Sequence, residues 1–405
     1  VLFGLDAYNG TVLWTFFSHE MRRSNMPRDG SNMVATDDTL YITIGGECVA
    51  LDAQTGKRRM SVKVPQGRNV GWLSANNKQL LTTTVKAGSG YKADDGEWYN
   101  DASVDHVARL VSDSLVSHDS DAGKKQWAYK NGSVMNSTIT VAGDIIYFVE
   151  SRNAELNQSV NSRIAPAKLT AQYLVALNRI SGEKLWEKSV NFSKCKNMLY
   201  LAHADGTLIV TGSEDIKFKY GNKYISKKFY HIYAYDVSSP ALRFGTENPI
   251  VPKLWQTDQT PEDYRESEQS RKKLDRNSHH GGHLQHPLVV GQRLFSDWRA
   301  FDLRSGNLLK DITVPPRRGC GNMAASNHLM FYRNHSQEIW DFNAKTKKPI
   351  PLQGSRSGCW LGIIPAQGLM LAPESSGGCS CLKADITIQT SAAWVPLSAL
   401  KKPKK

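Results

Sequence analysis

The fold of this chain is decided by one ten-residue stretch, Leu5-Asp6-Ala7-Tyr8-Asn9-Gly10-Thr11-Val12-Leu13-Trp14. The apolar residues before Asp6 alternate with a period of two, which is typical of a strand. An Asp side chain can accept hydrogen bonds from turn amides, and a Gly such as Gly10 can adopt φ > 0. The stretch therefore predicts a strand, a tight turn and a second strand that carries Trp14.

Versions of this stretch, which we call the repeat phrase, return along the chain. Each copy starts its turn with Asp, or once with Asn, at Asp6, Asp52, Asp119, Asn178, Asp236, Asp302 and Asp341. The intervals between these positions are 46, 67, 59, 58, 66 and 39 residues. A unit of this size is about one four-stranded propeller blade, with loop insertions in the longer intervals. The repeat predicts an all-β chain, a β-propeller of four-stranded antiparallel blades.

The number of blades follows from the units. Seven phrases and a last unit without one, Cys359 to Leu397, make eight units, but the first contains only its outer strands. We predict eight blades with the first one incomplete, and seven as the alternative if the first strands share a blade with the last unit. We expect one propeller domain over residues 1–398, truncated at its N-terminus and part of a longer polypeptide, and a basic tail over 399–405.

Composition limits the classes of function. The formal net charge of +13 is spread over many loops and favours acidic partners, although a basic surface is more often simply a soluble one. No nucleic-acid-binding module accompanies the charge, so nucleic acid is a poor candidate partner. No run of about 18 apolar residues is present, so we expect no transmembrane segment.

Several stretches depart from the repeat. Polar insertions are expected at Lys86 to Asp105 and at Glu150 to Thr170, and a hairpin rich in Lys and Tyr at Ile216 to Lys228. The segment from Thr257 to Asn277 is charged and nearly free of large apolar residues, which predicts a mobile surface loop.

The phrase Asp-x-x-x-Gly-x-x-x-Trp resembles the tryptophan-docking repeat of the PQQ-like β-propeller proteins, in which the Trp packs between blades. Five further stretches resemble a planctomycete-type exported branch of this quinoprotein-like superfamily: Arg23 to Asn32, His283 to Pro287, Arg318 to Gly321, Ser357 to Trp360 and Pro373 to Cys381. The resemblance covers nearly the whole chain. It implies a propeller and an extracytoplasmic location, in the periplasm or at the cell surface, but no particular activity.

The quinoprotein dehydrogenases of the superfamily use adjacent cysteines, a calcium site of carboxylate and amide ligands, and a Trp floor under the quinone. This sequence has no Cys-Cys pair, and no calcium triad can be placed in it. PQQ with calcium is therefore an alternative cofactor that the motifs do not support. The phrase tryptophans Trp14, Trp127, Trp186 and Trp255 are expected to be core wedges between blades.

Cysteines gather in the last 86 residues, while Cys48 and Cys195 stand apart. The four are Cys320, Cys359, Cys379 and Cys381. Disulfides near the end of the chain are the favoured interpretation, ahead of free buried thiols and of a tetrahedral thiolate metal site. Cys379 and Cys381 lie too close for an easy mutual bridge, so each is expected to pair with Cys320 or Cys359.

A second candidate metal site lies on the approach to an inner strand. It consists of four histidines, His279, His280, His283 and His286, with Asp275 or Asp297 assisting. Imidazoles so close together could bind Cu, Zn or Fe, although a loop histidine is more often a hydrogen-bonding group.

A third constellation is predicted to bind a ligand at the channel face, where polar loops enter the inner strands. Its members are Arg22, Arg23, Arg28, Asp29, Asn32, Arg318, Arg356 and Glu374, with Trp98 as a residue that could stack on a ligand. Arginine pairs suit an acidic ligand. Equally, these arginines could bind backbone carbonyls between blades.

Two functions from different classes follow. The leading hypothesis is a non-catalytic, exported binding or scaffold module for an envelope protein or an acidic polysaccharide, because the repeat is strong and no catalytic set is assembled. The alternative is a quinoprotein-like or metal-dependent oxidoreductase with its cofactor at the channel.

Overall fold

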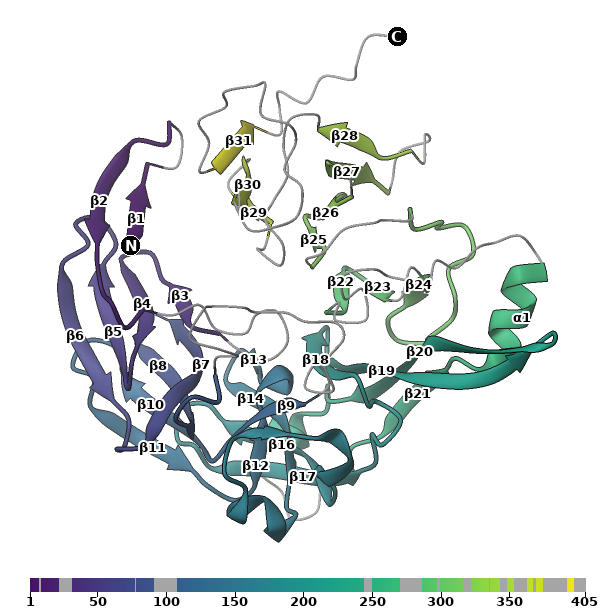
Figure 1. Cartoon of the computed structure of the whole chain (residues 1–405), viewed down its shortest axis with the longest axis horizontal. Helices are drawn as coiled ribbons and strands as arrows, with labels where there is room; N and C mark the ends of the chain where they lie inside the picture. The colour runs from purple at the N-terminus through teal and green to yellow at the C-terminus, as the bar shows by residue number, and fades with distance from the viewer. Residues whose placement is uncertain are drawn as a thin grey trace. The chain divides into compact units, whose positions relative to one another are not determined.

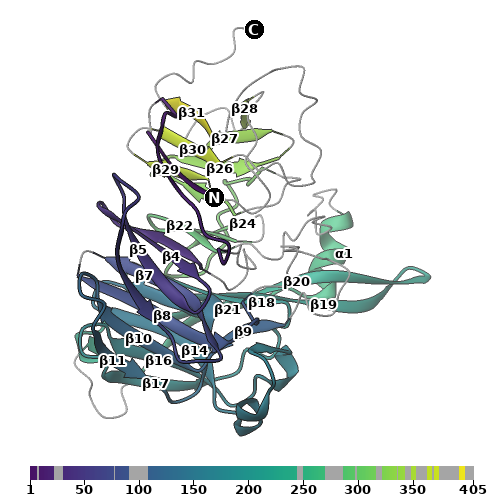
Figure 2. The same cartoon turned by 60° about the vertical axis from the view of Figure 1, so that its left-hand side comes forward.

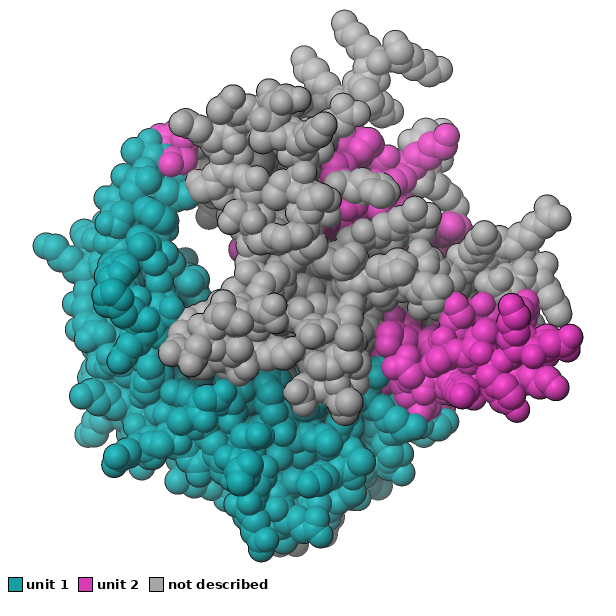
Figure 3. Space-filling model, viewed as in Figure 1, with its two compact units in different colours: residues 1–6, 11–212, 235–253 teal, residues 7–10, 213–234, 254–405 magenta. Residues whose placement is uncertain are grey.

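The architecture was determined as a computed structural model of the whole chain (Figure 1). It describes residues 1–6, 9–21, 31–76, 78–90, 108–243, 250–269, 286–296, 299–315, 322–334, 336–342, 348–352, 363–366, 369–373 and 392–396. The chain divides into two compact units, which Figure 3 shows in two colours. The first unit contains residues 1–6, 11–212 and 235–253, and the second contains residues 7–10, 213–234 and 254–405.

The first unit contains a series of antiparallel sheets that follow one another in sequence. The first sheet pairs β1 (Leu2–Leu5) with β2 (Val12–Phe16). The second contains β3 (Met33–Ala35), β4 (Thr39–Ile44), β5 (Glu47–Asp52) and β6 (Arg58–Lys63). The third contains β7 (Arg68–Asn76), β8 (Gln79–Lys86), β10 (Ser114–Asp119) and β11 (Lys125–Tyr129).

The fourth sheet is larger, because β15 from the expected insertion Glu150 to Thr170 and the strand β9 extend its edge. It contains β9 (Arg109–Ser112), β12 (Ser133–Met135), β13 (Thr140–Ala142), β14 (Ile145–Ser151), β15 (Arg163–Ile164), β16 (Gln172–Asn178) and β17 (Lys184–Val190). Short 3-10 helices lie at η2 (Asn136–Thr138), η3 (Ala154–Gln158) and η4 (Pro166–Lys168).

The next sheet, through which the unit division passes, contains β18 (Met198–Ala204), β19 (Thr207–Tyr220), β20 (Lys223–Asp236) and β21 (Lys253–Asp258). A 3-10 helix η5 (Pro240–Arg243) precedes β21, and the helix α1 (Pro261–Gln269) follows it. Three sheets follow in the second unit. The first contains β22 (Leu288–Val290), β23 (Arg293–Ser296) and β24 (Arg299–Asp302), and the second contains β25 (Ala324–Ala325), β26 (Leu329–Arg333), β27 (Gln337–Asp341) and β28 (Ile350–Leu352). The third contains β29 (Ile364–Ala366), β30 (Leu369–Pro373) and β31 (Ala392–Pro396).

The predicted fold class is confirmed, since the chain is all-β and built from antiparallel sheets of the size of propeller blades. The number of blades stays a prediction. One expectation is wrong: the segment from Thr257 to Asn277 is not a loop throughout, because residues 253–258 form β21 and residues 261–269 form α1.

The core lies between consecutive sheets. Tyr41 and Cys48 of the second sheet pack on Val70 and Leu80 of the third. On the opposite face of the second sheet, Ile42 joins a cluster that includes Leu2 and Phe16 of the first sheet. Neighbouring residues of β4 thus bury their side chains on opposite faces, as the period of two requires.

The turns of the second, third and fourth copies are built by the same contacts. In the second copy, Asp52 Oδ1 accepts hydrogen bonds from Gln54 N at 3.0 Å and Thr55 N at 2.8 Å. Gly56 N donates to Asp52 O at 2.8 Å, and the φ of Gly56 is +67°. The same contacts recur at Asp119 and Asn178, so Asp and Gly in the phrase are explained by turn chemistry.

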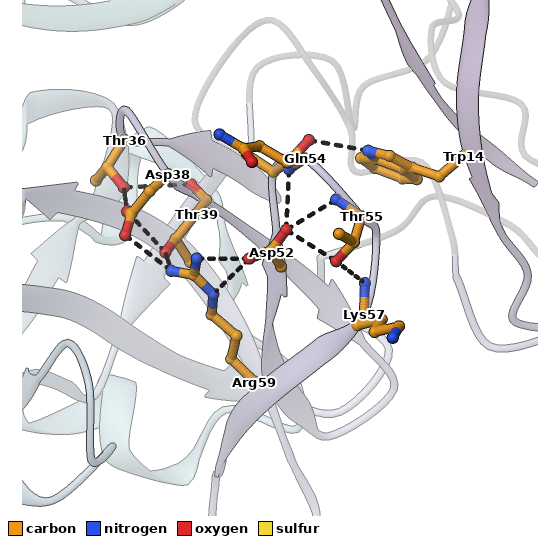
Figure 4. A network of polar contacts seen from close by, with 10 residues as sticks. Trp14, Thr36, Asp38, Thr39, Asp52, Gln54, Thr55, Lys57 and Arg59 are labelled. Carbon is orange, nitrogen blue, oxygen red and sulfur yellow. Dashed lines mark hydrogen bonds and ion pairs between the residues drawn. The ribbon is translucent and has the colours of Figure 1, made fainter.

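An Arg of the second copy reinforces the same turn (Figure 4). Arg59 Nη2 lies 2.6 Å from Asp52 Oδ2, and Arg59 Nη1 lies 2.9 Å from Asp38 Oδ2. The pKa of Asp52 is lowered to about 2, mainly by the hydrogen bonds that its carboxylate accepts from Arg59. Arg59 thereby links the turn before β4 with the turn after β5.

The phrase Trp covers the Gly of the following copy. Trp14 Nε1 donates to Ala53 O at 2.8 Å, and a Cβ placed on Gly56 would lie 2.6 Å from the Trp14 ring. Trp255 bears the same relationship to Leu303 and Gly306. A β-bulge one residue before each Trp in β2, β11 and β17 shifts the register there.

Two deviations of the described copies follow from the sequence. Met60 takes the Trp position of the second copy, and a Cβ on Gly123 would lie 3.3 Å from its sulfur, which is a looser contact. The fifth copy has Pro240 where the first four copies and the sixth have Gly. Trp186, which precedes that copy, is buried and its indole N–H has no hydrogen-bond partner.

Candidate interaction surface

Most of the side chains that the sequence predicts as sites lie outside the described residues. These are Arg22, Arg23, Arg28, Asp29, Trp98, Arg318, Arg356 and Glu374 of the ligand set, His279, His280 and His283 of the metal set, and Cys320, Cys359, Cys379 and Cys381. Their roles therefore stay predictions.

Asn32 and His286 are the two predicted residues that are described. The carbonyl of Asn32 accepts a hydrogen bond from Thr43 N at 3.0 Å, directly before β3, as expected for an entry to an inner strand. The backbone N–H of His286 donates to Asn322 Oδ1 at 3.2 Å, before β22. Neither contact tests a ligand or a metal.

Cys48 and Cys195 are not joined in disulfides, and both are buried. Burial raises the pKa of Cys48 to about 12, so its thiol stays protonated and is a poor nucleophile or metal ligand. Among the described residues, no three or more His, Cys, Asp or Glu side chains are grouped so that they could hold a metal ion.

The phrase tryptophans do not suit a quinone floor. The rings of Trp14, Trp127 and Trp255 lie against the glycines Gly56, Gly182 and Gly306, and their N–H groups donate to backbone carbonyls. These aromatic faces are occupied by the protein's own turns.

A buried ionic network in the fourth sheet is a structural feature rather than an open site. Glu150 is fully buried and accepts from Tyr129 Oη at 3.0 Å, while Arg152 Nη2 lies 2.7 Å from its Oε1. Arg152 also binds Glu187 through two nitrogens, at 2.9 and 2.6 Å, and its guanidinium lies 3.8 Å from the Tyr173 ring centroid. Each carboxylate is paired, as burial of charge requires.

The hairpin β19–β20 is the largest departure from the repeat. Each strand has 14 residues, whereas β21 has six, so the outer half of the hairpin continues beyond β21 (Figures 1 and 2). The Lys/Tyr-rich hairpin expected at Ile216 to Lys228 is thereby confirmed. An isolated two-stranded hairpin is at best marginally stable in water, so this one needs support.

The support comes from α1, which covers one face of the hairpin. Phe218, Phe229 and Tyr264 form a buried aromatic cluster, with centroids 5.7 Å apart for Phe218–Phe229 and 5.5 Å apart for Phe218–Tyr264. Arg265 Nη2 donates to Lys219 O at 3.0 Å, and its guanidinium lies 5.6 Å from the Phe218 ring. These contacts hold the hairpin as a preformed arm.

A buried histidine also fixes the base of the hairpin. The side chain of His231 is 1% exposed, and its Nδ1 lies 2.6 Å from Asp258 Oδ1. Its Nε2 lies 3.3 Å from Glu214 Oε1. Three strands, β19, β20 and β21, are therefore joined through one imidazole.

The opposite face of the hairpin, which we call the open face, carries the residues that alternate along each strand with those packed on α1. They are Asp215, Lys217 and Lys219 of β19 and Tyr224, Ser226 and Lys228 of β20. Lys228 Nζ binds Asp215 at 2.9 and 3.0 Å, and Lys217 Nζ lies 5.8 Å from the Tyr224 ring centroid. The open face therefore combines exposed lysines with an aromatic ring.

The helix α1 is not predicted by the sequence analysis, nor are the contacts with which it supports the hairpin. A signal was present: Thr260 N donates to Asp263 Oδ2 at 2.6 Å, Asp263 N donates to Thr260 Oγ1 at 3.4 Å, and Pro261 is the first helical residue. Thr-Pro-x-Asp is a capping-box pattern that favours a helix start. In the part of the chain that the structure describes, no helix has the length and apolar character needed to cross a membrane.

A family model described as outer membrane protein assembly factor BamB matches residues 1–261 of the 405. The solved structure of BamB from Moraxella catarrhalis is similar at 10% identity and a TM-score of 0.48, over 91% of this chain and 84% of that chain. The computationally designed Ika8 protein is similar at 8% identity and a TM-score of 0.49, over 88% and 84%. Quinohemoprotein alcohol dehydrogenase ADHIIG from Pseudomonas putida HK5 is similar at 12% identity and a TM-score of 0.38, over 84% and 48%. No curated protein matches the chain.

Proposed function

Because the chain belongs to the family of outer membrane protein assembly factor BamB, we propose that it is an exported, non-catalytic binding module that holds a protein partner in the bacterial envelope. The family description names an assembly factor, a role that depends on contact with other proteins. Such a module works outside the cytoplasm and needs no cofactor.

The observation that carries the proposal is the braced hairpin β19–β20. Its covered face is packed on α1 through Tyr264, which is 7% exposed, whereas Tyr224 on the open face is 69% exposed. A rigid element with an exposed aromatic ring supplies contact area at a low cost in conformational entropy. These features support binding rather than chemistry.

The test is co-purification from the native host. The full chain, with an affinity tag, is expressed there, crosslinked in intact cells and purified, and co-purifying proteins are identified by mass spectrometry. We expect an envelope protein in a stoichiometric amount, retained in the absence of added metal or quinone. If no protein exceeds the level found with an unrelated tagged propeller, or if polysaccharide is retained instead, the proposal is wrong.

A further inference from the structure

We propose that the open face of the hairpin β19–β20 binds an acidic, extended polypeptide segment of the protein partner. This inference rests on the proposed function and names the chemistry of the partner. It is carried by three properties of the open face: its uncompensated charge, the spacing of its lysines and its rigidity.

The charge is local and one-sided. Between Ser213 and Tyr230 the chain has five lysines and two carboxylates, Glu214 and Asp215. Glu214 is 8% exposed and lies beside His231 on the covered face, and Asp215 is paired with Lys228. Among the described residues, no carboxylate pairs with Lys217 or Lys219, the two open-face lysines of β19, and both are exposed.

The spacing of the lysines selects the shape of the partner. Lys217 and Lys219 lie two residues apart on one strand and so point to the same face, about 6.8 Å apart. An extended polypeptide with Asp or Glu at alternate positions repeats at the same distance. Its carboxylates can therefore meet both lysines at once, with the same repeat along both strands.

Tyr224 adds a contact that charge alone does not supply. Tyr224 is 69% exposed, and its ring centroid lies 5.8 Å from the ammonium nitrogen of Lys217. A Tyr ring packs on the backbone and on the methylene groups of an extended chain. Since α1 holds the other face through Phe218 and Tyr264, this arrangement exists before the partner binds.

The experiment measures binding of a defined probe to the full chain. The probe is a fluorescein-labelled peptide of about ten residues in which Glu alternates with Thr, followed by fluorescence anisotropy. We expect saturable binding, weakened when NaCl is raised from about 50 to about 300 mM. The variant K217E/K219E is expected to lose affinity by about tenfold or more, and Y224A by about threefold.

The matched control is K124E/K125E, which makes the same change in net charge at two exposed lysines near the turn of the third phrase. It is expected to bind the probe like the wild type. Thermal melts of all variants check that the fold is intact. Two further probes define the chemistry: the same peptide with Gln for Glu, and a polygalacturonate oligomer.

Equal binding of K217E/K219E and the wild type would overturn the inference, as would equal affinity for the Gln peptide. Tighter binding of polygalacturonate would overturn it in favour of a saccharide surface. Failure of the inference is distinguishable from failure of the proposed function. In the first case the native partner co-purifies equally with K217E/K219E, and in the second the wild type retains no partner.

Discussion

The indole N–H of Trp127 donates to the carbonyl of Arg179 at 3.0 Å while the Trp127 ring lies against Gly182. One copy of the phrase thereby holds the turn of the next. Two independent reasons require a glycine at position 182. Its φ is +75°, and a Cβ there would lie 2.5 Å from Cδ2 of Trp127.

Gly182→Ala is therefore expected to destabilise the fold by about 3 kcal/mol, which combines left-handed backbone strain with a clash against the indole. Gly143→Ala is the matched control, since its φ is +60° and no described atom lies within 4 Å of the added Cβ. It is expected to cost about 1 kcal/mol. Urea unfolding measures both, and equal losses would show that the Trp127 contact contributes nothing.

Arg152→Met is expected to destabilise the protein by about 3 kcal/mol, because it leaves the fully buried Glu150 carboxylate without its cation. The hydrogen bond from Tyr129 to Glu150 remains in that variant. The double variant R152M/E150Q should recover part of the loss, since the buried charge is then absent. Urea unfolding of the double-mutant cycle tests the coupling, and simple additivity of the two changes would refute it.

The stabilisation from Glu187 is expected to depend on pH. The hydrogen bonds from Arg152 are the largest cause that lowers the pKa of Glu187 from 4.5 to about 2. A lowered folded-state pKa gives stability that is present above the unfolded value and lost as the pH falls through the folded one. The difference in melting temperature between wild type and Glu187→Gln should thus shrink between about pH 4.5 and about pH 2. A difference that is constant over this range would contradict the assignment.

Tyr264→Ala is expected to loosen the hairpin without unfolding the sheets, because Tyr264 packs on Phe218 and Tyr220 at 5.5 Å in each case. Amide hydrogen exchange in residues 216–229 should rise by about tenfold or more, while exchange in β14 and β16 stays unchanged. Tyr224→Ala, on the open face, is the matched control and should leave exchange as in the wild type. Unchanged exchange in Tyr264→Ala would show that α1 does not brace the hairpin.

Much of the fold was predictable because the repeat encodes local chemistry. Asp52 and Gly56 close a turn through hydrogen bonds that need no distant partner, and alternation in Thr39–Ile44 assigns a face to each side chain. Family and fold class followed from the same pattern and are confirmed. The helix α1 was not predicted, because Tyr264 is surrounded by charged residues that are typical of a surface loop. The capping box before it and the burial of Tyr264 were therefore overlooked.

The candidate site was less predictable, because a binding surface depends on which side of an element is left uncovered. The order of residues established that Ile216 to Lys228 forms a hairpin with lysines and tyrosines on both strands. It could not establish that Phe218 and Phe229 face inward onto Tyr264, a contact made across 35 or more residues of sequence. That packing decides which of the two alternating sets of side chains is buried. The other set, which includes Lys217, Lys219 and Tyr224, is left exposed on one face. The sequence by itself determines the local periodicity of the strands. The tertiary structure decides which face is exposed, because apolar area is buried between segments that are distant in sequence.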